Sequence, residues 1–269
     1  MTFSEARRRA AREVGVLDAR HLLAWAAGVA PADIVALGPD PLPEGATVRL
    51  ERALARRREG WSVAHVTGRA EFWGRDFAVT RAVLAPRPET ETLVERALSA
   101  PFADLLDLGT GSGCIAVTLL AERRDAAGLA SDLSGSALAC ARKNAARHGV
   151  ESRLRMRRSD WWDKVHERFD LVVSNPPYIG VREMDALSPE VLREPRKALT
   201  DGGDGLGAYR EICGGLAAHL RPGGRAIVEI GPTQGTAVRA LFAAAGLEDV
   251  RVHPDMDGRD RVVEGHLPA

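Results

Sequence analysis

The sequence predicts an α/β fold with a seven-stranded, mostly parallel sheet, preceded by a small helical bundle and a β-hairpin. From Pro88 onward, short apolar runs alternate with stretches of helical periodicity, and strands that alternate with helices form parallel sheets covered on both faces. Near the N-terminus, apolar residues recur instead at helical spacing alone. The length of 269 residues suits one domain of about 190 residues with a smaller one beside it.

The N-terminal part of the chain is predicted to be helical. Ser4 can cap a first helix and Asp18 a second one, because their side chains accept hydrogen bonds from free backbone N–H groups. Pro31 suits the first turn of a third helical stretch. The segment 38–45 is rich in Pro and Gly and is expected to be a loop, and a charged amphipathic helix over 46–59 follows it.

A β-hairpin is predicted over 69–80, where polarity alternates and Gly74 occupies a turn position. We therefore divide the chain into a helical domain over 1–68, a hairpin linker over 69–85 and an α/β domain over 86–269. In the α/β domain we expect strands at 104–108, 128–132, 153–157, 169–174, 225–230, 249–253 and 261–265, and helices at 89–98, 114–123, 135–148, 207–220 and 234–245.

Composition argues against several classes of protein. Basic and acidic residues both number 37, whereas proteins that grip long nucleic acids usually carry a basic excess. The three cysteines form no CxxC pair and the seven histidines no HxxxH pair, so neither a disulfide framework nor a metal site is indicated. The sequence has no signal peptide pattern and no apolar run of about 18 residues. We expect a cytoplasmic monomer with no metal, no membrane contact and no stable nucleic acid binding.

The strongest local motif is DLGTGSG, which follows an apolar strand and opens a helix. Glycines at such a point let the backbone turn sharply and approach a ligand closely. A dinucleotide fingerprint reads GxGxxG, whereas this motif reads GxGxG, with Cys114 where the last glycine would stand and Asp107 two positions before the first. The pattern favours a ligand with an ammonium and a carboxylate over a pyrophosphate. The predicted contacts are Asp107, Gly109, Thr110, Gly111, Ser112 and Gly113.

Two further acidic residues follow the next predicted strands. Asp132 ends the second strand, where a carboxylate can accept hydrogen bonds from both ribose hydroxyls of a nucleoside; a plain helix cap is the alternative. Asp160 and Trp161 follow the third strand. Asp160 can accept a hydrogen bond from the amino group of adenine, and Trp161 can cover the base. The alternative is a loop Asp beside a buried Trp, neither of which contacts a ligand.

The run Asn175-Pro176-Pro177-Tyr178 directly follows the apolar strand 169–174. An amide nitrogen is a poor nucleophile because its lone pair is delocalised. The Asn175 side-chain oxygen and the Pro176 carbonyl can each accept one N–H of a planar NH2 group, which fixes that group and raises its electron density. Tyr178 can pack against its flat face. No general base is needed, since a cationic product can lose its proton afterwards.

These motifs resemble the release-factor glutamine methyltransferase family (PrmC/HemK), and the resemblance covers roughly 60–269 well, whereas 1–60 matches only in size and character. Two residues depart from the family pattern: Glu89 replaces a frequent Asp, and Arg193 replaces a frequent aromatic residue on the substrate side. The other stretches that carry the resemblance are Arg69-Ala70-Glu71-Phe72-Trp73, Pro86-Arg87-Pro88-Glu89-Thr90-Glu91, Ser159-Asp160-Trp161, Arg193-Glu194-Pro195 with Ala198-Leu199, and Asp260-Arg261-Val262-Val263.

The resemblance implies a Rossmann-like class I methyltransferase. It implies transfer of a methyl group from S-adenosylmethionine to the glutamine amide nitrogen of a Gly-Gly-Gln motif in peptide chain release factors. It places cofactor contacts on the glycine loop, Asp132, the pair Asp160-Trp161 and Asn175. Asn175, Pro176 and Tyr178 then act as catalytic residues, and together with Pro177 they hold the glutamine. Because a glutamine is small, we expect the helical domain to recognise the protein substrate.

Two other interpretations stay open from the residues. An amino-methyltransferase acting on adenine or guanine in DNA or RNA would use the same Asn-Pro-Pro-Tyr logic, because a flipped base offers the same planar NH2 group. A basic groove around Asn175 would favour that interpretation. The second is a non-catalytic scaffold that binds the cofactor, which loss of Asn175 or of the glycines would favour; both are intact.

Overall fold

The computed structural model describes residues 1–269. The chain folds into two compact units. The helical unit comprises Met1–Arg69 together with Ser188–Arg193, and the α/β unit comprises Ala70–Leu187 and Glu194–Ala269. The segment 188–193 is therefore an exception to the expected domain over 86–269, because it packs with the N-terminal helices. No helix is both long enough and apolar enough to cross a bilayer.

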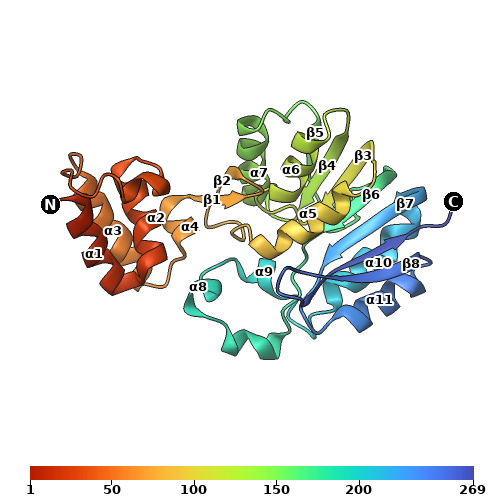
Figure 1. Cartoon of the computed structure of the whole chain (residues 1–269). Helices are drawn as coiled ribbons and strands as arrows, with labels where there is room; N and C mark the ends of the chain where they lie inside the picture. Colours follow the sequence, from red (N-terminus) through yellow and green to blue (C-terminus); the bar gives the residue numbers. More distant parts are fainter. The chain divides into compact units, whose positions relative to one another are not determined.

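The helical unit is a bundle around one apolar core (Figure 1). Its largest fully buried side chains include Leu22, Leu23, Ile34, Leu50 and Leu54. The elements are α1 (Phe3–Val14), α2 (Val16–Ala27), the 3-10 helix η1 (Pro31–Ile34), α3 (Ala46–Arg58), α4 (Val63–Thr67) and α8 (Pro189–Leu192).

Both predicted helix caps in this unit are wrong. Thr2, not Ser4, caps α1, and it forms a capping box in which the Glu5 side chain accepts from the Thr2 N–H at 2.7 Å. The second helix begins after Gly15, so Asp18 lies within its first turn. There its carboxylate accepts from the Arg57 guanidinium at 2.5 Å.

The segment 188–193 is held in the helical unit by two arginines. Arg57 Nη2 also contacts Glu190 Oε1 at 2.6 Å. The Arg193 guanidinium lies over the Trp61 ring, 5.4 Å from its centroid. Arg193 thus contacts the helical unit, which accounts for a cation at this position.

The α/β unit contains the predicted seven-stranded sheet, in the order β5-β4-β3-β6-β7-β9-β8. Strand β9 pairs antiparallel with both of its neighbours, and the other pairings are parallel. The strands are β3 (Asp104–Leu108), β4 (Ala127–Asp132), β5 (Leu154–Arg158), β6 (Phe169–Ser174), β7 (Leu220–Glu229), β8 (Glu248–Pro254) and β9 (Asp260–His266).

Helices cover both faces of this sheet (Figure 1). Successive strand residues point to opposite faces, so Leu105 and Leu171 pack on one side and Leu106 and Val172 on the other. The central strands β3 and β6 are buried on both faces, which explains why they are mostly apolar. The first face packs against α5 (Glu91–Leu98), α6 (Cys114–Glu122) and α7 (Gly135–Arg147), and the second against α10 (Gly207–His219) and α11 (Gly235–Ala244).

The predicted hairpin is formed by β1 (Arg69–Phe72) and β2 (Arg75–Ala78). Its two turn residues, Trp73 and Gly74, have φ of 54° and 63°, as a tight two-residue hairpin turn requires. After β6 the chain forms three short elements that the sequence did not predict: η3 (Val181–Ala186), α8 and α9 (Arg196–Leu199).

Candidate active site

Three neighbouring strands end side by side at the candidate site. Leu108 of β3 is in register with Ser174 of β6 on one side and with Ser131 of β4 on the other. Ser174 Oγ donates to the Leu108 carbonyl at 2.7 Å, which ties two of these ends together. The glycine loop, Asp132 and Asn175 therefore leave the sheet at one edge, where ligands bind in open parallel sheets.

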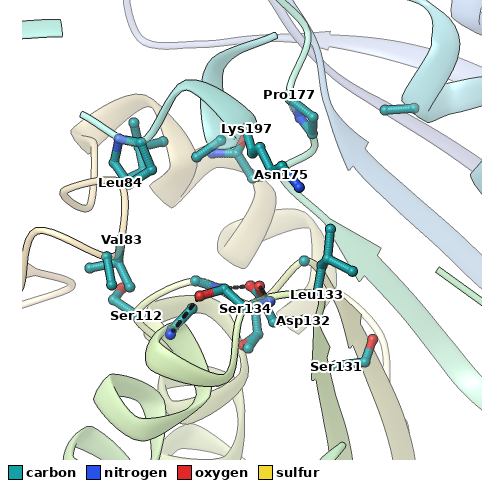
Figure 2. Close-up of a pocket in the computed structure, with 18 of the residues that line it drawn as sticks. Val83, Leu84, Ser112, Ser131, Asp132, Leu133, Ser134, Asn175, Pro177 and Lys197 are labelled. Atoms are coloured by element: carbon teal, nitrogen blue, oxygen red, sulfur yellow. Dashed lines mark hydrogen bonds between the residues drawn. The ribbon is translucent and has the colours of Figure 1, made fainter. Parts of the chain in front are cut away.

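A cavity of about 1410 Å³ opens at this edge, larger than the roughly 300–1,000 Å³ of most small-molecule sites. Figure 2 shows Asn175, Pro177 and Lys197 on one side of the cavity and the Ser131–Ser134 segment on the other, with Val83 and Leu84 beside the gap. Of the predicted site residues, the cavity is lined by Gly109, Thr110, Gly111, Ser112, Asp132, Asp160, Trp161, Asn175 and Pro177.

The glycines of the loop have two different roles. Gly109 and Gly111 have φ of 71° and 56°, and a Cβ added at either would meet nothing within 4 Å. They therefore leave open space at the cavity wall, as a closely approaching ligand requires. Gly113 does not line the cavity; a Cβ there would lie 3.0 Å from Ala141 Cβ, so this glycine permits close packing of α6 against α7.

Asp107 lies beneath the loop rather than in the cavity wall. Its Oδ2 accepts from Thr110 Oγ1 at 2.6 Å and from the Ala116 N–H at 3.3 Å, while its Oδ1 has no hydrogen-bond partner. Burial raises the pKa of this carboxyl to about 7. Asp107 thus supports the loop, and the predicted contact with a ligand ammonium stays a prediction.

Asp132 lies at the cavity wall, and the backbone holds both of its oxygens. Oδ2 accepts from the Gly111 N–H at 2.9 Å and Oδ1 from the Ser134 N–H at 2.8 Å. Burial raises the pKa of Asp132 above its ordinary value. Each carboxylate oxygen can accept more than one hydrogen bond, so both keep capacity for the hydroxyl groups of a ligand.

Asp160, Trp161 and Leu133 also line the cavity. Trp161 has a φ of 40°, which is uncommon for a residue with a side chain and costs backbone energy. Ser159 Oγ holds this turn by donating to the Trp161 carbonyl at 2.9 Å. Leu133, which was not predicted as a site residue, follows Asp132 and is 42% exposed, so it offers an apolar surface to a flat ring.

Only part of the Asn-Pro-Pro-Tyr run lines the cavity, and the rest lies behind the lining. Asn175 and Pro177 line the cavity, whereas Pro176 is buried and Tyr178 lies outside the lining. The Tyr178 hydroxyl donates to Glu229 Oε1 at 3.3 Å. Burial raises the pKa of this phenol far above its usual range, so it stays a donor. Contact between the Tyr178 ring and an acceptor stays a prediction.

Two buried residues of the site were not among the predicted site residues. Thr90 accepts from Asn175 Nδ2 at 3.2 Å and donates to Glu229 Oε2 at 2.5 Å. Thr90 belongs to the segment Pro86–Glu91, which carries part of the family resemblance, and this could have indicated a role for Thr90. Glu229 ends the apolar strand β7, so it had the same signal as Asp132: a carboxylate at the carboxyl end of a parallel strand.

The charges that line the cavity are mixed. Its basic residues are Arg81, Arg87, Arg158, Arg196, Lys197 and Arg210, and its acidic residues are Asp132, Asp160, Asp201, Asp204 and Glu211. Some are paired, such as Arg210 with Asp204 at 2.6 Å. The cavity as a whole is therefore lined by charges of both signs.

Comparison with known proteins agrees with this geometry. A family model described as "PrmC N-terminal domain" matches residues 4–68, and one described as "Methyltransferase small domain" matches residues 88–206. A solved methyltransferase from Pyrococcus furiosus is similar in fold, with a TM-score of 0.55 at 17% identity over 80% of this chain and 98% of that one. At 17% identity, the likeness to this solved structure shows a shared fold.

Much closer relatives are named "Release factor glutamine methyltransferase". The one from Cereibacter sphaeroides is 59% identical over 94% of this chain and 91% of its own length. The one from Caulobacter vibrioides is 45% identical over 93% of this chain and 88% of its own length. The chain therefore belongs to the release factor glutamine methyltransferase family.

Proposed function

We propose that this chain transfers a methyl group from S-adenosylmethionine to the side-chain amide nitrogen of a glutamine in peptide chain release factors, as the names of its relatives describe for them. The observation that carries the proposal is the convergence of the three strand ends. It brings a glycine loop, the Asp132 carboxylate and the Asn175 amide to one cavity.

The residues on one side of the cavity fit this cofactor. Open space above Gly109 and Gly111 suits its amino acid portion, and the partnerless Asp107 Oδ1 beneath the loop adds negative charge that suits its ammonium group. Asp132 has acceptor capacity for the ribose hydroxyls. Trp161 and Leu133 offer apolar surface for the adenine. When bound there, the cofactor supplies an electrophilic methyl group on a sulfonium.

Asn175 supports transfer by positioning rather than by proton removal. Its Nδ2 is engaged by Thr90, so its Oδ1 is the end left to accept an N–H of the glutamine amide. The glutamine nitrogen then forms a bond to the methyl carbon as the carbon–sulfur bond breaks and its electron pair stays on sulfur. The methylated amide loses its proton to water. Alignment and hydrogen bonding at the acceptor are therefore the contributions of the protein.

For substrate recognition we propose the helical unit. A glutamine side chain offers too little surface to identify one protein among many, so the remaining specificity needs a larger surface. A family model for this N-terminal domain matches residues 4–68, so the unit is a part of the chain that has its own relatives, which supports a separate role in recognition.

The test is mass spectrometry of a purified release factor after incubation with the enzyme and S-adenosylmethionine. We expect a gain of one methyl group, located by fragmentation on the glutamine of the Gly-Gly-Gln motif. A release factor with Asn in place of that glutamine is the matched substrate control and should gain nothing. Methylation of DNA or RNA, with none on the release factor, would contradict the proposal.

A further inference from the structure

A line of hydrogen bonds runs through the wall of the cavity behind Asn175. Asn175 Nδ2 donates to Thr90 Oγ1 at 3.2 Å, Thr90 Oγ1 donates to Glu229 Oε2 at 2.5 Å, and the Tyr178 hydroxyl donates to Glu229 Oε1 at 3.3 Å. Thr90 is 2% exposed and Glu229 is 1% exposed, so water does not compete for these contacts. The line begins at the residue that faces the substrate and ends at a buried carboxylate.

The direction of this line follows from the chemistry of its members. An ionised carboxylate only accepts, and a threonine hydroxyl has a single hydrogen. Because Thr90 gives its hydrogen to Glu229, it can only accept from Asn175. An asparagine side chain is a donor at one end and an acceptor at the other, so Nδ2 must face Thr90, which leaves Oδ1 for the cavity.

The surroundings of Glu229 support an acceptor at the end of the line. Burial raises the pKa of Glu229 to about 7, and the hydrogen bond from Thr90 and the positive charge of Arg261 act in the opposite direction, so Glu229 is an ionised acceptor above about pH 7. Arg261 is itself fixed, since its Nη1 donates to the Ile230 carbonyl at 3.3 Å. Thr90 and Arg261 belong to two stretches that carry the family resemblance but had no predicted function in binding the cofactor or the acceptor.

We propose that Thr90 and Glu229 are positioning residues that set the polarity of the Asn175 amide, so that its oxygen rather than its nitrogen faces the substrate amide. The inference rests on the proposed function, because it matters only for an acceptor that presents N–H groups. With the amide reversed, the Asn175 NH2 group would face the NH2 group of the substrate glutamine. The nucleophilic nitrogen would then lose the hydrogen bond that aligns it.

A defect of this kind has a characteristic kinetic signature. The helical unit and the rest of the cavity still bind the release factor, so the substrate KM changes little. The lost contact is one that matters during transfer, so kcat falls. Cofactor affinity is unaffected, because the glycine loop and Asp132 lie outside this line.

The first test compares Thr90→Val with Thr90→Ser on the full-length protein. Valine keeps the shape and removes the hydroxyl, whereas serine keeps the hydroxyl. We expect Thr90→Val to lower kcat roughly tenfold to a hundredfold, with KM and the calorimetric Kd for S-adenosylmethionine within about threefold, and Thr90→Ser to restore most of the rate. A wild-type rate in Thr90→Val, or an equal loss in both variants, would overturn the inference.

The second test repeats Thr90→Val in an Asn175→Asp background. A carboxylate has oxygen at both ends and therefore no polarity to set, so removing the Thr90 hydroxyl should cost less than about threefold there. A purely structural Thr90 would cost the same in both backgrounds, which would refute the positioning role.

These results separate the inference from the proposed function. A wild-type enzyme that methylates the release factor, with Thr90→Val equally fast, refutes only the role of Thr90 and Glu229. A wild-type enzyme with no activity on the release factor refutes the proposed function first.

Discussion

The two sides of the cavity are fixed in different ways. On the cofactor side, one continuous stretch of backbone forms the loop, and the nearest side chain, Asp132, is held by the N–H groups of Gly111 and Ser134. On the acceptor side, three side chains meet from distant parts of the chain. Asn175 is 85 residues from Thr90, and Thr90 is 139 residues from Glu229.

This difference shows how one fold can keep a cofactor and change an acceptor. A cofactor side made of backbone depends on few side chains and tolerates change around it. An acceptor side made of a hydrogen-bonded line depends on every member, since each fixes the direction of the next. We therefore expect changes on the cofactor side to alter Kd and changes on the acceptor side to alter kcat.

The largest expected effect is that of Gly111→Val on cofactor binding. The branched side chain would occupy the open space at the cavity wall, so binding of S-adenosylmethionine should be lost in calorimetry while the circular dichroism spectrum is kept. Gly149→Val is the matched control, because Gly149 also has a positive φ, of 67°, and open space around it, but lies on the surface outside the cavity. It carries a similar backbone strain, of about 1–2 kcal/mol. Equal cofactor affinity in the two variants would place the ligand elsewhere.

A chain that begins at Arg69 should methylate intact release factor at least tenfold more slowly, because its recognition surface is gone, and bind cofactor within a few-fold of wild type. A short peptide that contains Gly-Gly-Gln is the control substrate and should be methylated at similar rates by both chains. In the shortened chain, the segment 188–193 loses its partners Arg57 and Trp61. An equal loss on peptide and protein would show that this segment, rather than recognition, is responsible.

Asp132→Ala should weaken S-adenosylmethionine binding by roughly tenfold to a hundredfold, as expected for the loss of hydrogen bonds to a charged group. Asp160→Ala should have a smaller effect, because Asp160 is exposed at the cavity rim. Calorimetry of both variants would rank them. The reverse ranking would mean that the base, rather than the ribose, accounts for most of the affinity on this side.

The smallest expected effect is on stability and comes from Glu229. Burial raises its pKa from 4.5 to about 7, so the folded chain takes up a proton there that the unfolded chain lacks. This contribution to stability is complete below about pH 4.5 and is lost as the pH rises through about 7. Relative to Glu229→Gln, the wild-type free energy of unfolding should fall by about 2 kcal/mol between about pH 5.5 and 8 in urea titrations. Parallel curves for the two proteins would contradict the raised pKa.

Much of the fold could be predicted because its signals are local. The central strands β3 and β6 are short, mostly apolar runs, and the Gly74 turn is visible in sequence. The cap at Thr2 was missed although Glu5 three residues later forms its box. The short elements over 181–199 have no apolar period to reveal them, and nothing in the sequence indicates that Arg193 packs on Trp61.

The site was predictable to the same extent. Asp132 and Asn175 follow strand ends, which locates them from sequence alone. Asp107 was predicted from its place two positions before the first glycine of the motif, but its position beneath the loop depends on the Thr110 and Ala116 contacts that only the fold provides. Thr90 was missed because its role comes from two partners distant in sequence, and a threonine beside a Pro-rich segment has many uses.

The most direct test of the central claim is the single-turnover rate of methyl transfer to a release factor by wild type and by Asn175→Ala. Losing one hydrogen bond to a poised group typically costs about 3 kcal/mol of transition-state stabilisation. We therefore predict a rate lower by roughly a hundredfold or more, with cofactor affinity within a few-fold of wild type. Equal rates for the two proteins would contradict the account.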